Sequence, residues 1–117
     1  MAGRSQLHLR ETWGADSSYT SGNITGTRSP TTVTDNAAAV TAVTVTIATV
    51  PAGKSRAGIS VRAASDDVAA ATVEPEAITN DAGEAVFNIT NVATGTATVS
   101  FTVATGATIG TVAVTTN

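Results

Sequence analysis

Apolar and polar residues alternate with a period of two along most of the chain after residue 40. The clearest case is 96–103, where Ala97, Val99, Phe101 and Val103 alternate with Thr or Ser. A second case is 42–48, where three β-branched residues alternate with Thr and Ala before Pro51 ends the run. Successive side chains of a strand point to opposite faces, so this pattern predicts half-buried β-strands.

Four further segments show the same alternation over shorter lengths: Ile59–Ala63, Ala71–Val73, Ala85–Thr90 and Thr111–Thr115. Thr79–Glu84 contains Asn, Asp and Gly, which favour chain reversal, and predicts a turn. Gly106 predicts another turn, and Gly110 is interpreted as a flexible position before the last strand. No segment has a useful helical period, and 36–40 is the single candidate for a helical turn. About six short strands separated by turns predict an all-β sandwich.

The chain changes character near residues 35–40, which places a domain boundary there. Residues 1–36 are polar and irregular, and they predict an extended N-terminal arm. Residues 37–117 are expected to form an immunoglobulin-like β-sandwich with a small core of Val, Ile and Ala around Phe87 and Phe101. Such a core gives modest stability, and edges with few charges are weakly protected against pairing. Packing against neighbouring subunits would offset both weaknesses.

Composition excludes several classes of function. The formal net charge is -3, with 6 Lys+Arg against 9 Asp+Glu, and the basic residues form no dense run, so a nucleic-acid partner is not expected. Charged residues make up 13% of the chain, about half the usual share, which is typical of virion, fibre and cell-wall proteins. There is no cysteine, and no apolar run has the length of a membrane span or a secretory signal. If Met1 is the natural start, we expect the protein to stay in the cytosol until assembly or lysis.

Candidate catalytic and metal-binding residues are few. His8 is the single histidine, and no triad or metal cluster can be built around it. Asp66, Asp67, Asp81 and Glu84 lack the spacing of a calcium loop and are interpreted as turn residues. No glycine-rich phosphate loop is present. The sequence therefore predicts a protein that is not an enzyme and has no catalytic, cofactor-binding or metal-binding residues. A Thr-rich strand face can bind a polysaccharide or an ice lattice through its regular hydroxyl groups. We interpret these faces as ordinary solvated strand faces, which the β propensity of Thr favours.

Four segments together resemble a known family: Ala57–Arg62, Ala71–Pro75, Thr79–Phe87 and Gly95–Phe101. They are similar to bacterial immunoglobulin-like domains, which occur as repeats in invasin- and intimin-type adhesins and as appendages on tailed-phage virion proteins. The resemblance covers roughly residues 40–117 and implies an immunoglobulin-like architecture without a binding site. Adhesin repeats usually occur in tandem behind a signal and a membrane anchor, whereas this chain has one copy and a preceding arm.

The arm contains the candidate partner-binding residues Leu7, Leu9, Arg10, Trp13 and Tyr19. Aromatic and Arg side chains set among small residues are typical of interaction hot spots, so we expect them to anchor a neighbouring subunit. The alternative is that they cover one end of their own sandwich.

These observations favour a structural virion protein of a tailed phage, either a capsid decoration or cement protein or a fibre-associated protein. Its expected partners are the major capsid protein, other virion proteins or copies of itself, bound through the arm in an oligomeric assembly. The alternatives are a spacer repeat of a bacterial surface adhesin and a self-assembling extracellular filament subunit whose arm completes a neighbour's sheet. The expected location is the virion, or the bacterial cell surface in the alternatives.

Overall fold

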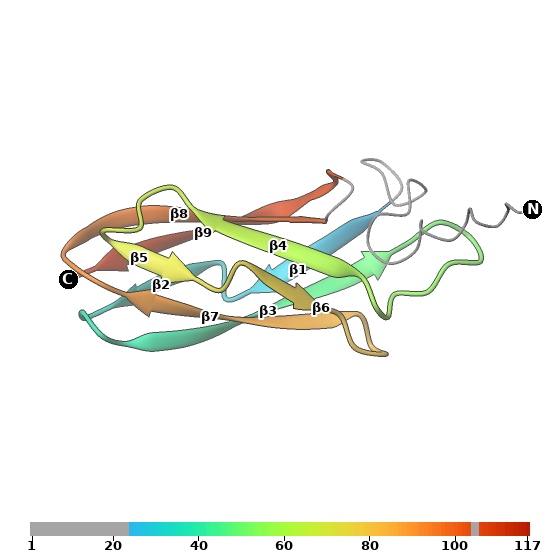
Figure 1. Ribbon diagram of the computed structural model, residues 1–117, viewed down its shortest axis with the longest axis horizontal. Coiled ribbons are helices and arrows are strands. Elements are labelled where there is room, and N and C mark those ends of the chain that lie inside the picture. The colour runs from blue at the N-terminus through green and yellow to red at the C-terminus, as the bar shows by residue number, and fades with distance from the viewer. Residues whose placement is uncertain (1–23, 104–105) are drawn as a thin grey trace, which may run out of the picture.

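The computed structural model describes residues 24–103 and 106–117. These residues form nine strands and no helix, which confirms the all-β prediction (Figure 1). The strands are β1 (Thr25–Ser29), β2 (Thr32–Asp35), β3 (Val40–Thr49), β4 (Ser60–Ser65), β5 (Ala71–Val73), β6 (Glu76–Ile78), β7 (Glu84–Asn91), β8 (Gly95–Val103) and β9 (Thr108–Thr116).

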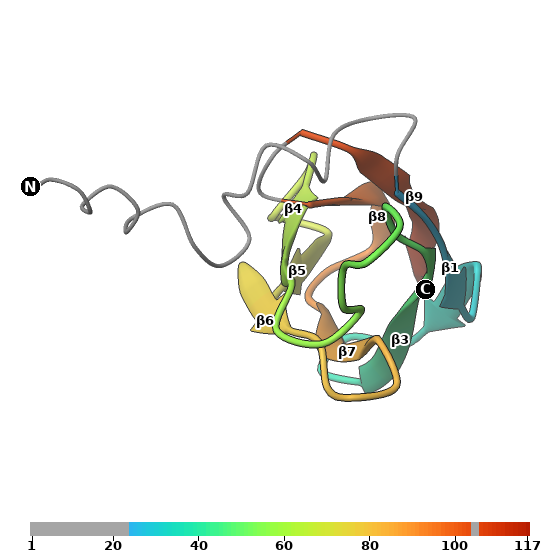
Figure 2. The same cartoon turned by 90° about the vertical axis from the view of Figure 1, so that its right-hand side faces the viewer.

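The strands make two sheets that enclose one core. The four-stranded sheet has the order β1-β3-β7-β5, and the five-stranded sheet has the order β2-β9-β8-β4-β6. All pairs are antiparallel except β2 with β9, which is parallel. Figure 2, a view along the sandwich, shows β8 and β9 on one side of the core and β3 and β7 on the other. Two sheets with these neighbours and crossovers form an immunoglobulin-like sandwich.

The alternation in sequence decides which side chains fill the core. In β8 the four apolar residues named above are buried, and the Thr and Ser residues between them are exposed or half-buried. In β3 the buried residues are Val43, Val45 and Ile47, each with 0% exposure. Phe87 from β7 meets Phe101 from β8 across the two sheets, with ring centroids 5.1 Å apart and planes tilted by 58°. Tilted aromatic pairs at this distance are favourable, so this contact joins the sheets at the centre.

The structure corrects the predicted boundary between arm and sandwich. Residues 24–36 were assigned to the arm, yet β1 and β2 lie in this range and are edge strands of the two sheets. Ile24 and Val33 are buried. The pattern missed these strands because β2 contributes only Val33 to the core and β1 contributes none of its own side chains, with Ile24 buried just before it. The sandwich therefore includes the residues from Ile24 onward, and the rest of the predicted arm lies outside the described residues.

Two smaller predictions also differ from the structure, and one strand was not predicted. The Ala-rich segment at 36–40 forms a turn, in which Ala38 has a φ of 74°, and leads directly into β3. Gly110 lies inside β9, which begins at Thr108 rather than Thr111. β6 was not predicted at all, because three residues that follow a proline carry no readable alternation.

The predicted turn at 79–84 is confirmed in detail. Asn80 accepts hydrogen bonds at Oδ1 from the N–H groups of Ala82 (2.9 Å) and Glu84 (3.0 Å). Gly83 has a φ of 81°, a value that favours glycine. Asn80 and Gly83 thus act in the turn as their residue types predict.

Candidate assembly surfaces

The outer face of the five-stranded sheet consists mainly of short uncharged side chains. We call it the hydroxyl face. Its members are exposed or half-buried and come from β2, β9, β8 and β4: Thr32, Thr34, Thr96, Thr98, Ser100, Thr102, Thr111 and Thr115, with Ala64 and Ala113.

The strand register arranges these residues in rows across the sheet. Thr34, Thr115 and Thr96 form one row, and Thr32, Ala113 and Thr98 form the next. Ser100 pairs with Thr111 on one side and Ala64 on the other in a third row. Neighbouring strands lie about 4.8 Å apart, and residues two apart on a strand lie about 6.7 Å apart. The face is therefore a regular lattice of methyl and hydroxyl groups.

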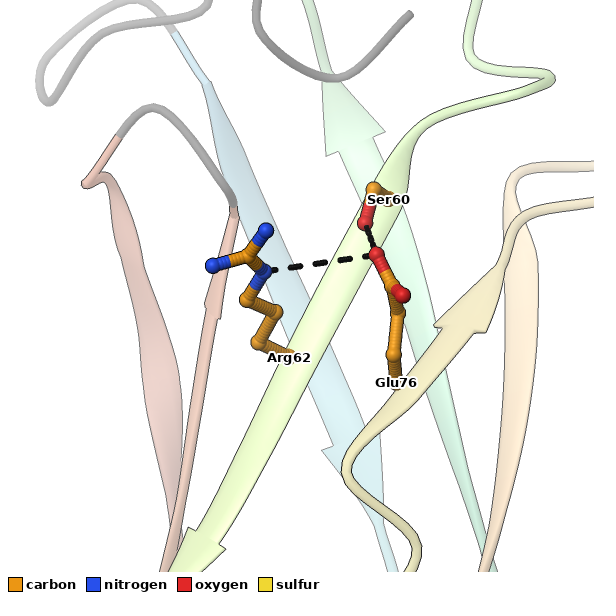
Figure 3. Close-up of polar contacts among 3 residues, drawn as sticks. All are labelled: Ser60, Arg62 and Glu76. Atoms are coloured by element: carbon orange, nitrogen blue, oxygen red, sulfur yellow. Dashed lines mark hydrogen bonds and ion pairs between the residues drawn. The ribbon is translucent and has the colours of Figure 1, made fainter.

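Charged side chains on this outer face lie at its margin, on β4 and β6. Glu76 on β6 lies opposite Arg62 on β4, with 4.0 Å between Arg62 Nε and Glu76 Oε2. The same carboxylate accepts a hydrogen bond from Ser60 Oγ (Figure 3). Both charged side chains are about half exposed, so the ion pair contributes little stability. The three residues tie the short strand β6 to β4.

Two charged side chains occupy edge positions where no strand pairs. Arg28 on β1 donates from Nε to the carbonyl oxygen of Thr111 on β9, at 2.7 Å. Glu74, just after β5, accepts at Oε1 from the N–H of Asn88 on β7, at 2.9 Å. Charged groups at sheet edges block pairing with another chain. Both edges are therefore protected locally by a side chain.

One buried polar side chain joins the sheets near the C-terminal end. Asn91 on β7 donates from Nδ2 to the carbonyl oxygen of Thr115 (3.2 Å) and to Oγ1 of Thr116 (2.9 Å) on β9. Thr116 Oγ1 in turn donates to the carbonyl oxygen of Ala70 at 3.0 Å. Asn91 Oδ1 is buried without a partner among the described residues.

Two of the four acidic residues considered for calcium accept hydrogen bonds from backbone groups. Asp66 Oδ1 accepts from the N–H of Thr98 at 2.8 Å, and Asp67 Oδ1 accepts from the N–H of Ala69 at 3.1 Å. Within residues 24–103 and 106–117, no three His, Cys, Asp or Glu side chains gather as a metal site. The same residues contain no helix long and apolar enough to cross a bilayer.

The predicted partner-binding residues, Leu7, Leu9, Arg10, Trp13 and Tyr19, all lie outside the described residues. Their role stays a prediction. Sequence reasoning found the alternation of β8 but missed the extent of the hydroxyl face, because two of its rows are completed by the unrecognised strand β2. The Thr-Val-Thr triplet at 32–34 was a short signal for that strand.

Comparison with known proteins gives a fold but no family. No family model and no curated protein sequence matches the chain with significance. Among solved structures, the chain is similar to domains 4 and 5 of the S-layer protein SbsC, with a TM-score of 0.61 and 21% sequence identity. The match covers 78% of this chain and 50% of that one, so the chain spans half the length of the solved S-layer fragment. At this identity the likeness shows a shared fold.

Proposed function

We propose that the chain is a structural, non-enzymatic module of a surface assembly, in which copies or neighbouring subunits pack against the hydroxyl face. The hydroxyl face is the observation that carries the proposal. Thr, Ser and Ala lose little rotamer freedom when they are covered, and they bring no charge that must be desolvated. Such a face can be buried in a subunit contact at low cost.

The similarity to S-layer domains supports the same proposal. An S-layer protein is a surface protein by its name, and this chain shares the fold of two of its domains. The resemblance to bacterial immunoglobulin-like domains, which occur on adhesins and on phage virions, points to the same class of structural role. Between these settings the S-layer similarity favours the cell surface. A capsid decoration or fibre-associated protein of a tailed phage stays a specific alternative.

A charge placed on the hydroxyl face tests the proposed contact. Thr98 is exposed near the middle of the face, and its N–H already bonds to Asp66. Thr98→Lys adds a long charged side chain that must be desolvated in any contact, whereas Thr98→Ser keeps a short hydroxyl. We expect Thr98→Lys to abolish ordered assembly seen by electron microscopy of concentrated protein, and Thr98→Ser to preserve it. Both variants should melt within a few degrees of the parent protein.

Assembly by Thr98→Lys equal to that of the parent protein would remove the hydroxyl face from the contact. Fractionation of the source organism tests the setting. Recovery with envelope sheets supports the cell surface, and recovery with purified phage particles supports the virion. A measured turnover that is lost on changing one polar residue would contradict a structural role altogether.

A further inference from the structure

β6 is an open edge of the five-stranded sheet. Pro75 accepts at its carbonyl oxygen from the N–H of Ala63, and Thr79 donates its N–H to the carbonyl oxygen of Ile59. Alternate residues of a strand direct their backbone groups to opposite sides. The N–H and C=O groups of Glu76 and Ile78 therefore point away from β4, and no strand among the described residues pairs with them.

The core beneath this edge is only partly covered. Ala63, Val73 and Ala77 pack against the core cluster but stay half-buried, and all three lie on β4, β5 or β6. On the outer side of β6, Ile78 is 57% exposed in the single chain. An added strand would cover both the apolar positions and the free backbone groups of this edge.

The same edge is acidic. Glu76 lies on β6 itself and pairs with Arg62, while Glu74 lies just before Pro75 with its carboxylate bonded to Asn88 of β7. A partner strand that carries positive charge and no negative charge complements this edge, because opposite charges on neighbouring strands are favourable and like charges are not.

The first ten residues of the chain have these properties. They contain Arg4 and Arg10 and no Asp or Glu. From Arg4 to Arg10, polar residues alternate with Ser5, Leu7 and Leu9, which gives one basic face and one largely apolar face for an extended segment. The roughly 15 residues between Leu9 and Ile24 span up to about 50 Å when extended, enough to reach a neighbouring molecule.

We propose that residues 4–10 of one copy pair with β6 of a second copy as an added strand. Leu7 and Leu9 cover the half-buried positions beneath the edge, and an Arg side chain lies beside Glu76. The occupant is a second copy, which the roughly 15 residues between Leu9 and Ile24 are long enough to reach. The contact is head to tail, so it continues from copy to copy and forms an array together with the hydroxyl face. This inference rests on the proposed assembly role and names its second contact.

The test uses two full-length variants that each lack one side of the contact. Ile78→Pro removes the outward N–H of β6 and leaves its bonds to β4 intact, because those bonds use the residues on either side. The second variant, Leu9→Asp with Arg10→Glu, puts negative charge on the donor segment, residues 4–10, in place of an apolar and a basic side chain. Val40→Pro is the matched control, since Val40 is an exposed apolar residue of β3 in the other sheet, its N–H points away from β7, and it belongs to neither proposed contact. The chain has no cysteine, so Asn117→Cys gives one dye site per copy for energy transfer between copies.

We expect the parent protein and Val40→Pro to associate with the same Kd. Either disabled variant alone should show a Kd at least about ten-fold higher, which corresponds to roughly 1.4 kcal/mol. The mixture of the two should form a heterodimer, because one supplies an intact segment and the other an intact edge. A circular dichroism melt checks that each variant is folded. If Ile78→Pro does not fold, the variant with Leu9→Asp and Arg10→Glu still tests the contact.

Unchanged association of Ile78→Pro, or a mixture that fails to pair, would overturn the proposed strand exchange while the assembly role stands. Absence of energy transfer between copies of the parent protein at every concentration would show that the segment does not pair with a second copy and would also overturn it. A parent protein that forms no contact with itself or with an envelope or virion fraction would overturn both proposals.

Discussion

Replacing Phe87 or Phe101 by leucine tests how the two sheets are joined at the centre of the core. Both rings are fully buried, and their centroids lie 5.1 Å apart across the sandwich. Leucine keeps each site apolar but is smaller and has no ring. Each single substitution should cost about 1–1.5 kcal/mol. The tilted ring contact adds about 0.5–1.5 kcal/mol beyond the buried area, and either substitution alone removes that contact.

The double variant therefore should lose less stability than the sum of the two single variants. We expect a coupling energy of about 0.5–1.5 kcal/mol from the cycle, because the second substitution has no ring contact left to remove. In a domain of this size, 1 kcal/mol shifts the melting temperature by about 4–8 °C, so the single variants stay measurable. Urea unfolding followed by circular dichroism suits the assay, since the single tryptophan is at position 13, outside the described sandwich.

A cycle that combines Phe87→Leu with Val33→Ala serves as the control. Val33 lies on the edge strand β2 of the opposite sheet and should behave independently of Phe87. Additivity within about 0.3 kcal/mol for the two phenylalanines, equal to the control cycle, would refute a direct ring contact between the sheets.

Three further substitutions, two of them with a control variant, test local geometry by urea unfolding and hydrogen exchange. Gly83→Ala should lower the free energy of unfolding by about 2 kcal/mol or more, because the φ of Gly83 is 81° and the new Cβ would lie 3.0 Å from a backbone oxygen. Its control is Gly53→Ala, where φ is 80° and the space is open, and the loss should be only about 1 kcal/mol. Asn80→Ala should cost about 1–2 kcal/mol by removing two accepted N–H bonds, and Asn80→Asp should cost less; equal losses would contradict the turn role. Gly26→Ala should speed exchange across β1, because its Cβ would lie 2.7 Å from the backbone oxygen of Thr46; unchanged exchange would contradict this close approach.

The long central strands could be predicted from the sequence because each buries one complete face. β8 carries four inward apolar residues, and β5 was predicted with its observed bounds. The six-residue alternation from Ala85 to Thr90 likewise predicted β7. In such strands one face is buried and the other faces solvent over the whole length, so apolar and polar residues alternate in the sequence.

The edges could not be predicted because their side chains bury little. β1 carries Gly26 where its backbone approaches β3 and β9 closely, and a glycine adds nothing to an alternation pattern. β6 contributes only Ala77 to the core side. The surfaces proposed for assembly depend on these edges, since β2 completes the hydroxyl face and β6 is the open edge. The hydroxyl face and the β6 edge both arise from pairing between segments that are far apart in the sequence, which local residue preference does not reveal.

The parallel pairing of β2 with β9 determines how the module carries tension. β2 lies next to the first described strand, and β9 ends one residue before the C-terminus, at the opposite end of the sandwich from the start of β1 (Figure 1). A pull on the two ends of residues 24–117 therefore acts along these strands in opposite directions. The hydrogen bonds between them lie across the pull and must break together rather than one after another. Load transmitted through neighbouring subunits to the two ends of residues 24–117 would therefore meet a pair of strands that resists shear.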